Sequence, residues 1–144
     1  MTLRWHDRTF SALSAAELYA ITALRERVFV VEQNCVYLDA DGADPQCRHL
    51  WAADGDAIHA YCRIVPAGLK FPEASIGRVI TAPAARGTGL GRELMTRAIA
   101  ASGAGPIRIG AQAHLEKFYG ALGFVRASDV YDEDGIPHIE MLRA

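Results

Sequence analysis

The feature that most constrains this chain is a glycine-rich turn that joins a predicted strand to a predicted helix. Residues 74–81 form a strand-like apolar run, and apolar residues then recur at helical spacing at positions 90, 94, 98 and 101. Glycine occupies positions 87, 89 and 91 between these segments. A further strand is predicted at residues 106–113, so the strand, helix and strand form a right-handed parallel crossover. The middle of the chain is therefore expected to hold the parallel part of an α/β fold.

The turn itself has the features of an anion site. At a helix N-terminus the first backbone amides have no carbonyl partner, and the helix dipole is positive there. The three glycines permit positive φ and let a phosphate approach without meeting a Cβ, while Arg86 and Arg92 add positive charge at the edges. Glycines that only turn the chain are the alternative, but three glycines with two arginines favour a phosphate site.

The glycine spacing separates the known kinds of phosphate turn. A dinucleotide-binding fingerprint needs glycine at positions 87, 89 and 92, but position 92 is Arg. A Walker loop ends in Gly-Lys-Ser/Thr, which is absent, and the only lysines are Lys70 and Lys117. A different class of phosphate-bearing ligand is therefore indicated.

The rest of the chain alternates strands and helices. Ser14 and Glu17 form a capping box for a helix whose buried face includes Ile21. Further predicted elements are strands at residues 3–10, 49–53, 57–65, 124–131 and 137–142, a short helix at 114–122 and a polar loop at 32–46. The hairpins add antiparallel strands, so we expect an α/β (mixed α+β) fold with helices packed on a mixed sheet, formed by a single domain over residues 1–144.

Composition disfavours several classes of function. The 144 residues include 15 Lys and Arg against 17 Asp and Glu, which leaves no positive excess for a nucleic acid or an anionic membrane. No stretch reaches the roughly 20 apolar residues of a membrane helix, and the N-terminus lacks the pattern of a signal peptide. Three cysteines at long spacings do not suggest a disulfide framework. A reduced, cytoplasmic protein is expected.

A metal site is not expected either. Asp39, Asp41 and Asp44 lie close together with Gly42, but an EF-hand loop would place its glycine at the sixth position and a Glu at the twelfth. A polar loop on the surface fits these residues better.

The turn resembles the phosphate loop of the GNAT acyltransferases, whose pattern Gln/Arg-x-x-Gly-x-Gly/Ala is met by Arg86, Gly89 and Gly91. The resemblance extends to Phe118-Tyr119-x-x-x-Gly123-Phe124, and the segment Arg27–Gln33 resembles the ElaA-like branch. It implies a GNAT fold: a central mixed sheet of six to seven strands, helices on both faces, and two splayed parallel strands that hold coenzyme A.

The resemblance implies acetyl-CoA as the co-substrate. The pantetheine arm would bind backbone groups of the strand before the loop, and the pyrophosphate would bind the turn. The cofactor-binding residues implied here are Val79, Ile80, Thr81, Arg86, Gly87, Thr88, Gly89, Leu90, Gly91 and Arg92.

Transfer to an amine also needs groups that move protons. A lysine-like amine has a pKa near 10.4 and must lose a proton, whereas the leaving thiol has a pKa near 8.5 and needs little help from an acid. By resemblance, Tyr119 is the group beside the departing sulfur. Many relatives carry a Glu on the strand before the loop, where this chain has Arg78, so Glu32 is the leading candidate base. Glu73, His49 and His114 are the other candidates.

The acceptor side is less defined by the sequence. Arg78, His49 and Phe29 are predicted to bind the acceptor, and Arg78 either holds an acceptor carboxylate or pairs with Glu32. The expected function is N-acetylation of a primary amine of a small molecule or peptide, by a monomer or homodimer. A non-catalytic acyl-CoA-binding or partner-binding module of the same fold is the alternative, and an unrelated nucleotide-binding protein is a third.

Overall fold

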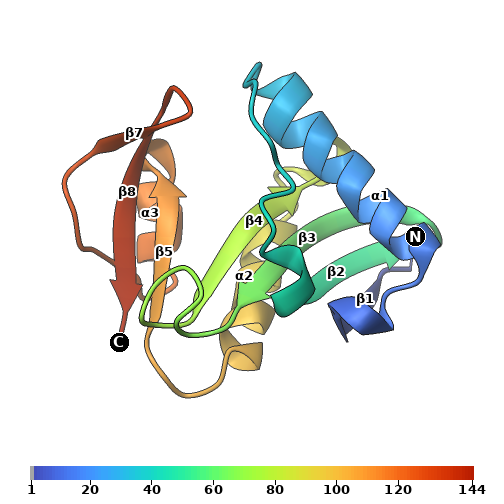
Figure 1. The fold of residues 1–144 in the computed structure, drawn as a ribbon, viewed down its shortest axis with the longest axis horizontal. Helices are drawn as coiled ribbons and strands as arrows, with labels where there is room; N and C mark the ends of the chain where they lie inside the picture. The colour runs from blue at the N-terminus through green and yellow to red at the C-terminus, as the bar shows by residue number, and fades with distance from the viewer. Residues whose placement is uncertain (1) are drawn as a thin grey trace.

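The structure, a computed structural model, describes residues 2–144. Within that range the chain forms eight strands and three α-helices (Figure 1). The strands are β1 (Arg4–Thr9), β2 (Arg48–Asp54), β3 (Ala57–Val65), β4 (Ser75–Thr81), β5 (Ile107–Gln112), β6 (Val125–Arg126), β7 (Tyr131–Glu133) and β8 (Ile136–Arg143), and the helices are α1 (Ala15–Arg25), α2 (Leu90–Ala101) and α3 (Glu116–Gly120).

The strands form two sheets that meet at a single point. One sheet has the order β1-β2-β3-β4, and the other has the order β5-β8-β6 with β7 also paired to β8. A parallel bridge between Ala74 and Ile107 joins them, and the amide of Arg108 donates to the carbonyl of Ala74 at 2.9 Å. Beyond this bridge β4 and β5 diverge (Figure 1). The expected splay is present, but the strands number eight rather than six to seven.

Helices cover both faces of the first sheet. Ser14 caps α1 as predicted, since its hydroxyl accepts from the Glu17 amide at 3.0 Å and its own amide donates to Glu17 at 2.8 Å. Ile21 and Val28 then pack against Trp51 in a core under α1. The helix continues as a π-helical segment over Glu26–Glu32, which ends where the predicted loop at residues 32–46 begins. No helix within residues 2–144 has the length and apolar content to cross a membrane.

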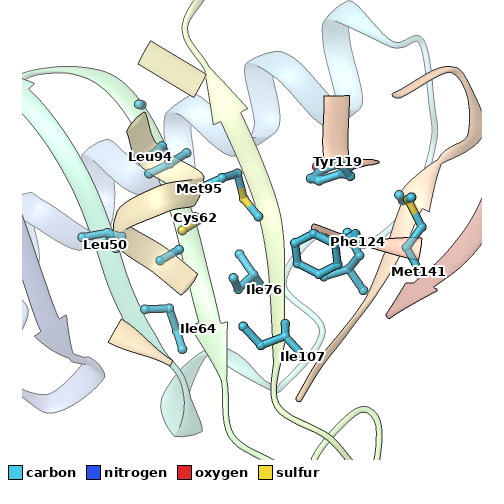
Figure 2. Close-up of a cluster of buried hydrophobic side chains, with 14 of the residues drawn as sticks. Leu50, Cys62, Ile64, Ile76, Leu94, Met95, Ile107, Tyr119, Phe124 and Met141 are labelled. Atoms are coloured by element: carbon cyan, nitrogen blue, oxygen red, sulfur yellow. The ribbon is translucent and has the colours of Figure 1, made fainter. Parts of the chain in front are cut away.

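The larger core lies under α2 and joins the two sheets. Leu94 and Met95 of α2 are fully buried, and Figure 2 shows them beside Cys62 and Ile76 of the first sheet, with Phe124 on the side of the second. Burying each such side chain contributes roughly 1.5–3 kcal/mol. This core fixes the strand ends from which the splay begins.

A bulge interrupts β4 shortly after the bridge. The register shifts between Tyr61 and Arg63 of β3, where two β4 residues, Arg78 and Val79, oppose one β3 residue. Arg78 has φ +52°, a left-handed conformation that is uncommon for a residue with a side chain. The bulge turns β4 and aims the Arg78 side chain at the segment that follows α1.

The C-terminal segment differs from the sequence prediction in detail. The predicted strand at 124–131 is split into β6 and β7, which both pair with β8. The predicted short helix at 114–122 begins as a 3-10 turn over Ala113–Leu115 and becomes α-helical only at Glu116. The amide of Ala127 and the Ser128 hydroxyl still bond to Glu140, which holds the interrupted segment against β8.

Candidate functional site

A cavity of about 1210 Å³ opens where the two sheets diverge. Its walls come from β4, the glycine-rich turn, β5, α3 and the segment after α1. Of the ten residues predicted to bind a cofactor, all but Thr88 line it. The Thr88 hydroxyl instead donates to the carbonyl of Ala85 at 2.6 Å, which braces the turn.

The turn presents backbone amides to this cavity. Gly87 and Gly89 have φ of +76° and +83°, and Gly89 is the N-cap of α2 with no side-chain cap bond. The first amides of α2 thus have no helical acceptor and no capping side chain. A Cβ on Gly91 would lie 3.1 Å from the Thr81 hydroxyl oxygen, so a side chain there would require Thr81 to shift. The turn can therefore hold an anion on its amides.

Glu32 lies beside this turn and pairs with Arg86. Both guanidinium nitrogens Nη1 and Nη2 of Arg86 donate to the Glu32 carboxylate, at 2.7 and 2.6 Å, and its Nε donates to the carbonyl of Thr81 at 3.1 Å. The hydrogen bonds from Arg86 lower the pKa of Glu32, which makes it a weaker proton acceptor while the pair persists. The alternative pairing of Glu32 with Arg78 is wrong.

Arg78 instead binds the segment that follows α1. Its Nε donates to the Asp39 carboxylate at 2.7 Å, and its Nη2 donates to the Asp39 carbonyl at 3.1 Å and to Asp41 at 3.4 Å. Its side chain is mostly buried and lines the cavity. Arg78 is therefore occupied by carboxylates of the chain itself, rather than free to hold a carboxylate of an acceptor.

Two further arginines complete a buried ionic network that the sequence analysis missed. Arg25 donates to Asp39 and Asp44, both at 2.7 Å, and Arg63 donates to Asp41 and Asp44. Burial opposes the charge of Arg25 and Arg63, but the carboxylates raise the pKa of both above the ordinary value. The aspartates considered for a metal thus bind arginines.

His49 lies away from the cavity, and we withdraw it from the acceptor-binding set. Its ring is fully buried between the Tyr61 hydroxyl, at 2.7 Å, and the carbonyl of Asp44, at 3.0 Å. Burial lowers the pKa of His49, so the ring is neutral and structural. Glu73 is likewise bound, to Arg108 at 3.1 Å, whereas Phe29 lines the cavity, and its role in acceptor binding stays a prediction.

Tyr119 lines the cavity from α3. It is 6% exposed and packs edge-on against Phe118 and Phe124, with ring centroids 5.0 and 6.0 Å apart. Burial raises the pKa of Tyr119, so the phenol stays protonated at neutral pH and can donate a hydrogen bond into the cavity.

Known proteins share both this sequence and this fold. The model of the acetyltransferase (GNAT) domain matches residues 19–143. Protein ElaA of Escherichia coli is 43% identical over 98% of this chain and 96% of its own length, and its crystal structure has a TM-score of 0.93. An acyl-CoA N-acyltransferase from Pseudomonas aeruginosa is 43% identical over 99% of this chain and all of its own, with a TM-score of 0.94.

More distant structures share only the fold. An aminoglycoside 6'-N-acetyltransferase complexed with coenzyme A is 15% identical, with a TM-score of 0.70. Together the close relatives support acyl transfer as the general class of activity. The glycine-rich turn, the splayed strands and the match over most of the sequence agree, and the chain belongs to the GNAT acetyltransferase family, in the branch of ElaA.

Proposed function

We propose that this protein is an N-acetyltransferase that moves an acetyl group from acetyl-CoA to a primary amine within a ternary complex. The observation that carries the proposal is the continuous cavity that runs from the uncapped turn of α2 to the segment that follows α1. A donor with a phosphate end and a reactive end would bind along such a cavity, and the acceptor would enter it at the end away from the turn.

The donor would bind along β4 and the turn. Beyond Ala74 the edge of β4 that faces β5 makes no ladder bond within residues 2–144, so Val79, Ile80 and Thr81 would offer backbone groups to a pantetheine arm, the Thr81 carbonyl once Arg86 has released it. The amides from Gly87 to Arg92 would take the pyrophosphate. The complex of a same-fold acetyltransferase with coenzyme A supports this ligand class.

The chemistry would then be direct attack by the neutral amine on the thioester carbonyl. Forming a neutral amine from a group with a pKa near 10.4 costs about 4–5 kcal/mol at pH 7. The C–S bond breaks, and the protonated phenol of Tyr119 hydrogen-bonds the departing sulfur. No metal is needed for these steps.

Glu32 would accept the amine proton, through water, once Arg86 turns to the pyrophosphate. The Glu32 carboxylate and the pyrophosphate would compete for Arg86, because Arg86 lies on the turn and binds Glu32 through both Nη atoms. Transfer of Arg86 to the phosphate frees the carboxylate and removes the cause of its lowered pKa. Glu32→Gln should lower turnover without weakening the affinity for coenzyme A.

Release of free thiol from acetyl-CoA, measured with and without a panel of primary amines, tests the proposal. We expect release that depends on the amine in the wild type, slower release in Gly89→Asn, and none in Gly89→Asp. Asn and Asp both tolerate the left-handed φ of Gly89, so the pair differs mainly in a negative charge at the phosphate site. Affinity for coenzyme A without amine-dependent release would instead support the non-catalytic binding module.

A further inference from the structure

Lys70 places a primary amine in the wall of the cavity. It lies in the loop between β3 and β4 and lines the same cavity as Arg78 and Tyr119. The chain has only one other lysine, Lys117, which is exposed on α3 and does not line the cavity. Lys70 is therefore the one lysine of this chain within the proposed site.

The amine lies against β5. A Cβ placed on Gly110 would be 3.7 Å from Lys70 Nζ and 3.1 Å from the Tyr131 hydroxyl oxygen. The neighbours of Gly110 on β5, Ile109 and Ala111, point into the core under α2 and are buried. Because side chains alternate along a strand, Gly110 faces the opposite side, where the acceptor is proposed to enter.

The register of β4 and β5 gives the position of this amine along the cavity. Counting along β4 and β5 from the Ala74–Ile107 bridge, Gly110 lies level with Gly77. Val79, the first proposed pantetheine contact, is two residues further on; because the Arg78 bulge lies between them, this is less than the about 7 Å that two residues span in a regular strand. Lysine has a flexible four-carbon stem, so a change of rotamer can move Nζ along the cavity wall.

The amine is also not held by a carboxylate. Within residues 2–144 Lys70 forms no ion pair. Of the acidic residues on this side of the cavity, Glu133 contacts His138 at 3.3 Å and Asp41 pairs with Arg63. Although Lys70 as a residue is exposed, its Nζ lies over Gly110 of β5 and 5.4 Å from the Phe71 ring centroid. Burial lowers the pKa of Lys70, which increases the fraction of neutral, nucleophilic amine.

We propose that Lys70 is acetylated in cis by the active site of its own chain, an inference that rests on the proposed function. Neutral Nζ attacks the thioester carbonyl carbon of bound acetyl-CoA, a C–N bond forms and the C–S bond breaks. The nitrogen proton passes to the departing sulfur, so the products are Nε-acetyl-Lys70 and coenzyme A as its thiol. The modification removes a positive charge from the acceptor side of the cavity.

Mass spectrometry of the intact chain and of its peptides after incubation with acetyl-CoA tests this. We expect one acetyl group on Lys70, formed at a rate independent of protein concentration and at least ~10-fold faster than on Lys117, because the reaction is intramolecular. Lys117 reports chemical acetylation by the free thioester. Acetylation should disappear in Gly89→Asp and in Lys70→Arg.

Three outcomes would overturn the inference: equal acetylation of Lys70 and Lys117, persistence in Gly89→Asp, or a rate that rises with protein concentration. Thiol release with added amines, measured on the same samples, separates this inference from the proposed function. Amine-dependent release with Lys70 unmodified refutes the cis acetylation and leaves the function intact. Failure of acetyl-CoA to bind the chain at all refutes both.

Discussion

Replacing Arg78 by alanine and by glycine separates the two consequences of its place in the β4 bulge. Its φ of +52° costs a residue with a Cβ about 1–2 kcal/mol relative to glycine. Both substitutions remove the hydrogen bonds to Asp39, but only glycine removes the strain. Glycine also costs about 0.4–1 kcal/mol through the greater entropy of the unfolded chain. The glycine variant should therefore be more stable than the alanine variant by about 1 kcal/mol.

Thermal and urea unfolding measure this difference. For a domain of this size 1 kcal/mol corresponds to about 2–4 °C in Tm. Both variants should be less stable than the wild type, although Asp39 keeps its bond to Arg25 at 2.7 Å.

The same two substitutions at Arg97 are the matched control. Arg97 lies in the interior of α2, pairs with Glu93 on the surface and covers the Trp5 ring. Glycine should there be about 1 kcal/mol less stable than alanine, so the order of the two variants is reversed. An alanine variant at Arg78 that is as stable as the glycine variant, or more so, would refute the strain assigned to the bulge.

Three other predictions concern the ionic network and the cavity. Arg25→Met should cost about 3–5 kcal/mol in unfolding free energy because buried Asp39 and partly buried Asp44 lose a partner. Arg126→Met, at an exposed pair, should cost less than about 1 kcal/mol, and equal losses would contradict the role of burial. Tyr119→Phe should lower the rate of thiol release more than the affinity for coenzyme A, and an unchanged rate would make Tyr119 structural. The hydrogen bonds from Arg63 lower the pKa of Asp41 in the folded state, so the stability that Asp41 adds is present above its unfolded pKa of about 3.9 and is lost as pH falls below that value. The unfolding free energy of Asp41→Asn, measured in urea, should therefore depend less on pH below about 3.9 than that of the wild type. An unchanged pH dependence would argue against this role of the Asp41–Arg63 pair.

Features fixed by local chemistry could be predicted from the sequence. The capping box of Ser14 and Glu17 depends on two side chains three residues apart, and it is present. The positive φ of Gly87 and Gly89 follows from the need to turn a strand into a helix within a few residues. The crossover from β4 through α2 to β5 likewise follows from the order of the elements, and its parallel bridge is present.

Features that depend on contacts far apart in the sequence could not be predicted. Glu32 and Arg86 are separated by 54 positions, and no local pattern indicates that they pair. The aspartates of the segment after α1 were recognised as a cluster, but their arginine partners lie on α1, β3 and β4. Histidine is a common catalytic base, but the burial of His49 depends on how β2 packs, which the local sequence does not indicate. One signal in the sequence could have been used: a single arginine within a buried strand needs an acidic partner, and a cluster of acidic residues elsewhere in the chain can supply it.

Thermal unfolding with added ligand tests the central claim, that the glycine-rich turn and the splayed strands form an acyl-CoA site. At about 100 times its Kd a ligand that binds only the folded state adds about 2.7 kcal/mol, which corresponds to a rise of about 5–10 °C in Tm for a domain of this size. We predict this rise with acetyl-CoA, a much smaller one with equal concentrations of ATP or NAD, and none with acetyl-CoA in Gly89→Asp. Stabilisation by ATP or NAD equal to that by acetyl-CoA would contradict the claim.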